Sequence, residues 1–136
     1  MKKFLLLGLL LPVLTQAECF PVTDVVKVVD GDTIDVRIKV LPTDLDLLAE
    51  IRVRMEGINA WESRTRDQAE KTKGLAAKAR LTELAQGQIT VCLNGKGKFG
   101  RWLGTLFDGD LNINEQLVQE GHAHYYDGGA RQSFSE

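Results

Sequence analysis

Alternation of apolar and polar residues predicts three β-strands in the first half of the chain. Residues 24–40 divide into two strands around the turn 30–32, which reads Asp-Gly-Asp. The second of these strands places its apolar residues on one face, at Ile34, Val36, Ile38 and Val40. A third strand, 51–55, carries Arg52 and Arg54 on its polar face. Each strand is therefore expected to have one buried and one solvated face.

The pattern changes to helical spacing after residue 67. A helix is predicted from Asp67 to Ala85, with Gly87 as a stop and Gly74 weakening its first half. Two more strands follow at 89–93 and 102–107, joined by the Gly- and Lys-rich loop 94–98. A second helix begins near Asn112, whose spacing to Glu115 has the form of a capping box.

Five short strands, with one helix between the third and fourth and a second helix near the C-terminus, indicate a particular fold class. They match a five-stranded Greek-key barrel of the OB type, an α+β fold that is mainly β, better than a sandwich or a parallel sheet. No repeat, linker or second domain is visible in the sequence. We therefore expect one domain over residues 18–136.

Residues 1–17 have the features of a secretory signal peptide. Two lysines precede the apolar run 4–14, and Ala17 supplies a small residue at the expected cleavage point. The alternative is a retained membrane anchor, but a bilayer span needs about 20 apolar residues and this run is shorter. The sequence therefore predicts an exported protein, periplasmic or extracellular, without stable membrane association.

Export to an oxidising compartment bears on the two cysteines of the chain, Cys19 and Cys92. In an OB barrel the first strand pairs antiparallel with the fourth, which would bring Cys19 toward Cys92. A disulfide is therefore expected. The alternative is two unpaired thiols, with Cys92 an ordinary buried strand residue.

The net charge excludes a protein that coats nucleic acid through a general basic excess. The chain has 17 basic and 19 acidic residues, and loss of Lys2 and Lys3 with the signal peptide leaves 15 basic residues and a formal charge of −4. An enzyme that contacts a few phosphates through a local basic cleft is compatible with this composition.

Four short motifs follow one another along the chain: 30–33 (DGDT), Arg54 with 57–62 (GINAWE), 98–101 (KFGR) and 114–121 (NEQLVQEG). Each motif alone is common. In this order, on this strand pattern, residues 24–126 resemble the staphylococcal (micrococcal) nuclease family, the thermonucleases. The resemblance implies a calcium-dependent phosphodiesterase that acts on nucleic acid.

The resemblance implies a metal site at the first turn. Asp32 matches the family's metal-binding carboxylate, Asp30 lies nearby, and the Asn59 amide and the Ala60 carbonyl are further candidate ligands. Asn59 stands where many members have aspartate, so we expect weaker Ca²⁺ affinity and room for another divalent metal. Taken alone, the turn is more typical of a hairpin in which Asp30 bonds its own backbone.

The resemblance also implies three catalytic residues. Arg54 and Arg101 match the two arginines that bind the phosphate and stabilise its developing charge. Glu62 matches the glutamate beside the attacking water. The alternatives are a surface ion pair between Arg54 and Glu56, and a solvated loop carboxylate at Glu62.

Substrate contacts are expected from the residues around these groups. Lys98 would contact phosphate and Phe99 a sugar or base, while Trp61 and either Tyr125 or Tyr126 would stack on bases. The alternatives are a solvated hairpin for the Lys98 loop and an ordinary core or surface aromatic for Trp61. His122 and His124 are more typical of a solvated element end than of a metal site.

The sequence thus predicts a secreted, monomeric, calcium-dependent nuclease, acting as an endonuclease on DNA or RNA. The alternative is a catalytically inactive nuclease-like OB module that binds nucleic acid or a protein partner, its metal site lost through Asn59. Retention of Arg54, Glu62 and Arg101 together favours the enzyme.

Overall fold

A computed structural model describes residues 18–41 and 47–126 of the 136-residue chain. The predicted signal peptide, residues 1–17, lies outside the described residues. In chain order the elements are β1 (Glu18–Asp30), β2 (Thr33–Lys39), β3 (Leu48–Met55), β4 (Ile58–Ala60), α1 (Gln68–Leu84), β5 (Ile89–Lys96), the 3-10 turn η2 (Lys98–Gly100), β6 (Trp102–Asp108), β7 (Leu111–Asn112), α2 (Ile113–Gln119) and β8 (Ala123–Tyr125).

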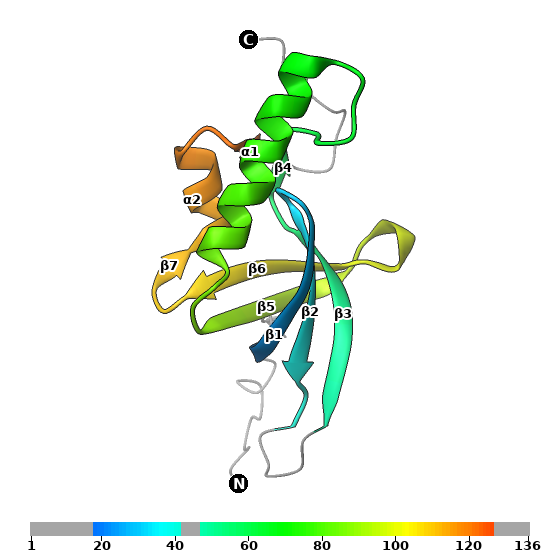
Figure 1. Cartoon of the computed structure of the whole chain (residues 1–136). Helices are drawn as coiled ribbons and strands as arrows, with labels where there is room; N and C mark the ends of the chain where they lie inside the picture. The colour runs from blue at the N-terminus through cyan, green and yellow to red at the C-terminus, as the bar shows by residue number, and fades with distance from the viewer. Residues whose placement is uncertain (1–17, 42–46, 127–136) are drawn as a thin grey trace, which may run out of the picture.

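Five of these strands close into a barrel. Their order is β3-β2-β1-β5-β6, and β3 also pairs with β6, which joins the two ends of the sheet. The β3–β6 pairing is parallel, whereas the other pairings within the barrel are antiparallel. Figure 1 shows α1 and α2 beside one another next to this barrel. The predicted OB-type barrel of mainly β, α+β class is confirmed.

The elements differ from the prediction in several places. β3 begins at Leu48, before the predicted start at residue 51, and β5 extends to Lys96, into the predicted loop. β1 begins at Glu18 because its first residues pair with β5, a contact that no local alternation reveals. The short strands β4 and β8 pair as a separate ribbon, too short to show a period of two. α1 runs without a break through Gly74 and ends at Leu84, before the predicted stop.

The core lies where the alternation and the helical spacing place it. It is formed by apolar residues of β2, β3, β5 and β6 together with those of both helices, of which the fully buried larger ones include Ile34, Val36, Val53, Met55, Leu81, Val91, Leu106, Ile113 and Leu117. No helix among the described residues is long and apolar enough to span a bilayer.

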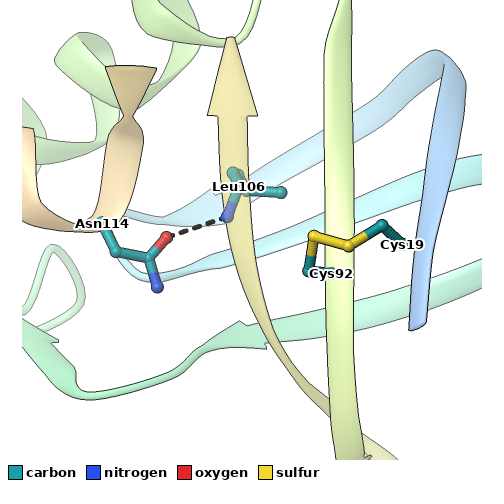
Figure 2. Close-up of a disulfide and its surroundings, with 4 residues drawn as sticks. All are labelled: Cys19, Cys92, Leu106 and Asn114. Atoms are coloured by element: carbon teal, nitrogen blue, oxygen red, sulfur yellow. Dashed lines mark hydrogen bonds between the residues drawn. A yellow bond between two sulfur atoms is a disulfide. The ribbon is translucent and has the colours of Figure 1, made fainter. Parts of the chain in front are cut away.

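Asn114, in the fourth motif, anchors α2 to the barrel. Its side chain is buried, and its Oδ1 accepts a hydrogen bond from the backbone N–H of Leu106 at 3.1 Å, as Figure 2 shows. Its Nδ2 donates to the carbonyls of Glu56 and Gly104. A buried amide that satisfies three backbone groups fixes the helix at one position on the sheet.

The predicted disulfide between Cys19 and Cys92 is present. The two residues lie directly opposite each other in the antiparallel pairing of β1 and β5 (Figure 2). The bond therefore links the N-terminal end of the barrel's first strand to a strand 73 residues later in the sequence.

Replacement of both cysteines by serine is expected to lower the free energy of unfolding by roughly 4 kcal/mol, because the disulfide restricts the unfolded chain across a long loop. Urea denaturation measures the loss. Unmodified protein kept reduced should show the same loss, whereas equal stability of the oxidised protein and the double serine variant would contradict the prediction.

An ion pair joins α1 to the end of α2. The Arg80 guanidinium donates to both carboxylate oxygens of Glu120, at 2.6 and 2.8 Å, and Gln116 donates to the same carboxylate. These contacts, first the one with Arg80 and then that with Gln116, lower the pKa of Glu120 to about 2. The carboxylate therefore stays charged in moderately acidic solution.

This pair gives stability a defined dependence on pH. Because the pKa of Glu120 is depressed on folding, its contribution is complete above the usual glutamate pKa of 4.5 and is lost as the pH falls toward about 2. Both side chains are partly exposed, so solvent screening keeps this contribution small.

Unfolding free energies measured in this acidic range should fall less steeply in Glu120→Gln than in the unmodified protein. Arg80→Gln should flatten the curve in the same way, because either change removes the pair. Parallel curves for all three proteins would show that the pair contributes nothing.

Candidate active site

The connection between β1 and β2 holds two aspartates, Asp30 and Asp32, that reach across to the end of β4 and the segment after it. The Oδ2 of buried Asp32 accepts a hydrogen bond from the Ala60 backbone N–H at 2.9 Å, and its Oδ1 accepts one from the Thr33 hydroxyl at 2.9 Å. Asp30 accepts a hydrogen bond from the Ser63 hydroxyl and lies 3.4 Å from the Arg64 guanidinium. Both aspartates therefore connect the turn to residues 60–64, in addition to any role in forming the turn itself.

Arg54, on β3, is held beside this turn. Its side chain is 13% exposed, and its guanidinium donates to the Met55 carbonyl at 2.8 Å and to Asn59 Oδ1 at 3.3 Å. The same group lies 3.6 Å from Asp32 Oδ2. These contacts set the orientation of the guanidinium before any substrate binds.

Arg101 approaches from the start of β6, the strand that closes the barrel against β3. Its Nε donates to the Lys98 carbonyl at 3.2 Å, and its guanidinium lies 5.5 Å from the centroid of the Phe99 ring. Arg54 pairs with Leu103 in the parallel β3–β6 register. Barrel closure therefore brings Arg101, which directly precedes β6, close to the strand that carries Arg54.

Both arginines line one cavity of about 260 Å³, and most of the other predicted site residues line it too. Its other walls include the residues predicted for metal and water, namely Asp30, Asp32, Asn59, Ala60 and Glu62, together with Trp61. Arg52 and Arg64 line it as well. Carboxylates and guanidinium groups thus face a common space, which suits an anionic substrate that must meet both a base and a source of positive charge.

Arg52 has a different role from its neighbour Arg54. It donates two hydrogen bonds to the Asp35 carboxylate, at 2.7 and 2.9 Å. The hydrogen bond from Arg52 lowers the pKa of Asp35, and the same contact raises the pKa of Arg52. Arg52 is therefore engaged in a surface pair between β2 and β3.

A second cavity of about 440 Å³ adjoins the first through Arg54 and Arg101, which line both. Lys98 and Tyr126 line this second cavity, and Met55, Ile58 and Leu103 give it an apolar wall. The arginine pair thus stands between a charged cavity and a partly apolar one.

Two of the residues predicted to contact the substrate line neither cavity. Phe99 lies at the tip of the loop before β6 with 90% of its surface exposed and a left-handed φ of 61°. Tyr125 is 62% exposed on β8. A role for either in substrate binding stays a prediction.

Trp61 is fixed on three sides. Its indole N–H donates to the Gly121 carbonyl at 3.2 Å, its backbone N–H donates to the His122 carbonyl, and Lys73 Nζ lies 4.3 Å from the ring centroid. These contacts attach the Glu62 loop to α1 and to the residues after α2. The Lys73 ammonium lies over one face of the Trp61 ring.

The structure adds residues that the sequence did not single out. Thr33, Ser63 and Arg64 hold the two aspartates, and Ser63 is 33 positions from its partner Asp30. No local pattern marks such a contact. The one available signal in the sequence was that Ser63 directly follows Glu62.

The oxygen atoms around Asp32 fit a hard cation in kind. Asp32, the Asn59 amide and the Ala60 carbonyl are the oxygen donors that Ca²⁺ prefers, and each Asp32 oxygen keeps lone pairs beyond its described hydrogen bond. Within residues 18–41 and 47–126, no group of three or more His, Cys, Asp or Glu is arranged to hold a metal. A cation here would therefore rely on neutral oxygens besides the carboxylate.

Comparison with known proteins agrees with this geometry. A family model described as the staphylococcal nuclease homologue matches residues 52–135, which is more than half of the chain and includes Arg54, Asn59, Glu62 and Arg101. No individual curated protein matches the chain significantly. The aspartate turn precedes the matched span, and the fold brings it into the same cavity. The chain therefore belongs to the staphylococcal nuclease family.

Proposed function

We propose that this protein is a nuclease that hydrolyses phosphodiester bonds of DNA or RNA with an activated water and requires Ca²⁺ or a related divalent cation. One observation carries the proposal. Arg54, on β3, and Arg101, directly before β6, line a single cavity together with Asp32 and Glu62. Family membership supports it.

The two arginines bind the scissile phosphate. A guanidinium carries five N–H donors, so Arg54 retains donors for phosphate oxygens beyond its bonds to Met55 and Asn59. Positive charge fixed in advance costs no reorganisation as negative charge grows on the phosphoryl oxygens. Arg101 adds a second such charge from its position directly before β6.

Glu62 orients the attacking water and accepts its proton. Its loop is held close to the aspartate turn by the Ser63–Asp30 and Ala60–Asp32 hydrogen bonds. Asp32, Asn59 and the Ala60 carbonyl would hold the cation, which supplies positive charge beside the phosphate when bound.

The second cavity receives the nucleoside next to that phosphate. Its apolar wall and Tyr126 suit a base or sugar, and Lys98 suits a neighbouring phosphate. Exposed Phe99 and Tyr125 stack on bases further along a polynucleotide.

Export of a monomeric enzyme is part of the proposal. A disulfide at an exposed position, Cys19, supports an oxidising compartment such as the periplasm or the medium. The basic and apolar composition of residues 1–17 supports a signal peptide.

Digestion of single-stranded DNA, duplex DNA and RNA, with Ca²⁺ or with a chelator, tests the proposal. Glu62→Gln should lower kcat by about 10²-fold to 10⁴-fold through loss of the base, and Arg101→Ala by about 10²-fold to 10³-fold through loss of charge stabilisation. Chelator should abolish cleavage.

Arg37→Ala is the matched control, since Arg37 pairs with Asp24 on the barrel surface and lines neither cavity. It should cut at the unmodified rate. If Glu62→Gln and Arg101→Ala both cleave at the wild-type rate in the presence of chelator, the mechanism is refuted. Binding of nucleic acid without cleavage under any metal would instead indicate an inactive binding module.

Asn59→Asp should bind Ca²⁺ about tenfold more tightly, because it adds a negative charge to the candidate ligands. Calorimetric titration measures the affinity. Asn112→Asp, which places the same charge at the N-terminus of α2, should leave the affinity unchanged. Equal affinities in all three proteins would remove Asn59 from the metal site, and cleavage only in Asn59→Asp would show that the natural chain is inactive.

A further inference from the structure

Gly74 lies where α1 meets the loop that carries Glu62. It is buried, and a methyl group at this position would lie 2.1 Å from the Glu62 carbonyl oxygen and 2.4 Å from the Ser63 nitrogen. These are backbone atoms, which cannot turn aside as a flexible side chain can. The helix and the Glu62–Ser63 peptide therefore approach to a distance that only glycine permits.

The same helix also touches the aspartate turn. A methyl group at Gly31, between Asp30 and Asp32, would lie 2.7 Å from the Ala77 Cβ. Ala77 is three residues after Gly74, so the two positions are neighbours on one helix face. One face of α1 thus contacts both loops that bring carboxylates to the cavity.

Contacts on both sides of Glu62 hold its loop, and α1 adds a further support. On one side of Glu62 in the sequence, Trp61 is bonded to the carbonyls of Gly121 and His122. On the other side, Ser63 is bonded to Asp30. The peptide between these two fixed residues rests on Gly74.

A glycine inside a helix is less favourable than alanine, so its presence in the middle of α1 calls for a packing reason. The close approach of the Glu62 carbonyl supplies that reason.

We propose that Gly74 is a positioning residue for Glu62: by letting the Glu62–Ser63 peptide rest directly on α1, it sets the place of the Glu62 carboxylate relative to the aspartate turn and Arg54. The kinetic consequence of this inference rests on the proposed nuclease function. The geometric consequence, a displaced Glu62 loop when Gly74 is replaced, does not rest on that function.

Gly74→Ala should push the Glu62 loop outward and lower kcat by about 100-fold, as expected for a displacement of roughly 1 Å in a catalytic group. KM should change little, because Arg54 and Arg101 are carried by the barrel. In the Glu62→Gln background the same substitution should have almost no further effect, since the group it displaces is already disabled. A full further loss there would show that Gly74 does not act through Glu62.

Leu81→Ala provides a control for loss of stability. Leu81 is buried on α1, about 10 Å along the helix from Gly74, so its truncation destabilises the domain at a distance from the Glu62 contact. At temperatures where circular dichroism shows both variants folded, Leu81→Ala should keep the unmodified kcat. An unmodified kcat in Gly74→Ala, or an equal loss in Leu81→Ala, overturns the inference.

Ala77→Gly decides the matter if Gly74→Ala fails to fold. It introduces no clash but removes the methyl group against Gly31, so kcat should fall to a value between those expected for the unmodified protein and Gly74→Ala. An unchanged kcat would then overturn the claim that this face of α1 positions the two loops.

Trp61 fluorescence gives a readout that does not need nuclease activity. In a Trp102→Phe background, the emission should shift in Gly74→Ala and stay unchanged in Leu81→Ala. If the unmodified protein cleaves nothing, the proposed function fails while this measurement still tests the positioning. Unchanged emission in folded Gly74→Ala would overturn it.

Discussion

The parallel pairing of β3 with β6 is the contact on which the site depends. Only three residue pairs make it, Val53 with Trp102, Arg54 with Leu103 and Met55 with Gly104. The other barrel pairings link antiparallel strands, and without this one the sheet would remain open. Closure brings Arg54 beside the strand that begins directly after Arg101. Two guanidinium groups, distant in the sequence, then share the boundary between two cavities.

The carboxylates reach the same cavity by a different route. Asp30 ends β1 and Asp32 lies in the turn that follows, whereas Glu62 lies in a loop, so no strand pairing joins Glu62 to the two aspartates. Their places follow from side-chain bonds, Asp32 to Ala60 and Asp30 to Ser63, and from packing on α1. The cationic half of the site is thus held by the barrel and the anionic half by loops pressed against a helix.

The sequence predicted the parts of this arrangement that depend on periodic patterns or on ordered motifs. Alternation located β2 and β3, and strand order in the barrel placed Cys19 opposite Cys92. Features that depend on a single contact between residues far apart in the sequence were not predicted. Gly74 looked like a weakness in a helix because its neighbour, the Glu62 carbonyl, comes from outside the helix. The exposure of Phe99 depends on backbone geometry at a loop tip, which composition does not determine.

Asn59 joins the two halves of the site. Its Oδ1 accepts a hydrogen bond from Arg54, and the same oxygen is a candidate cation ligand near Asp32. An aspartate here would add negative charge beside both groups, holding a cation more strongly but neutralising more of the Arg54 charge that a phosphate would meet. The amide has the opposite effects. In the proposed mechanism, one atom thus lies next to both the candidate cation ligands and Arg54, so its charge would set the balance between metal affinity and attraction for the substrate.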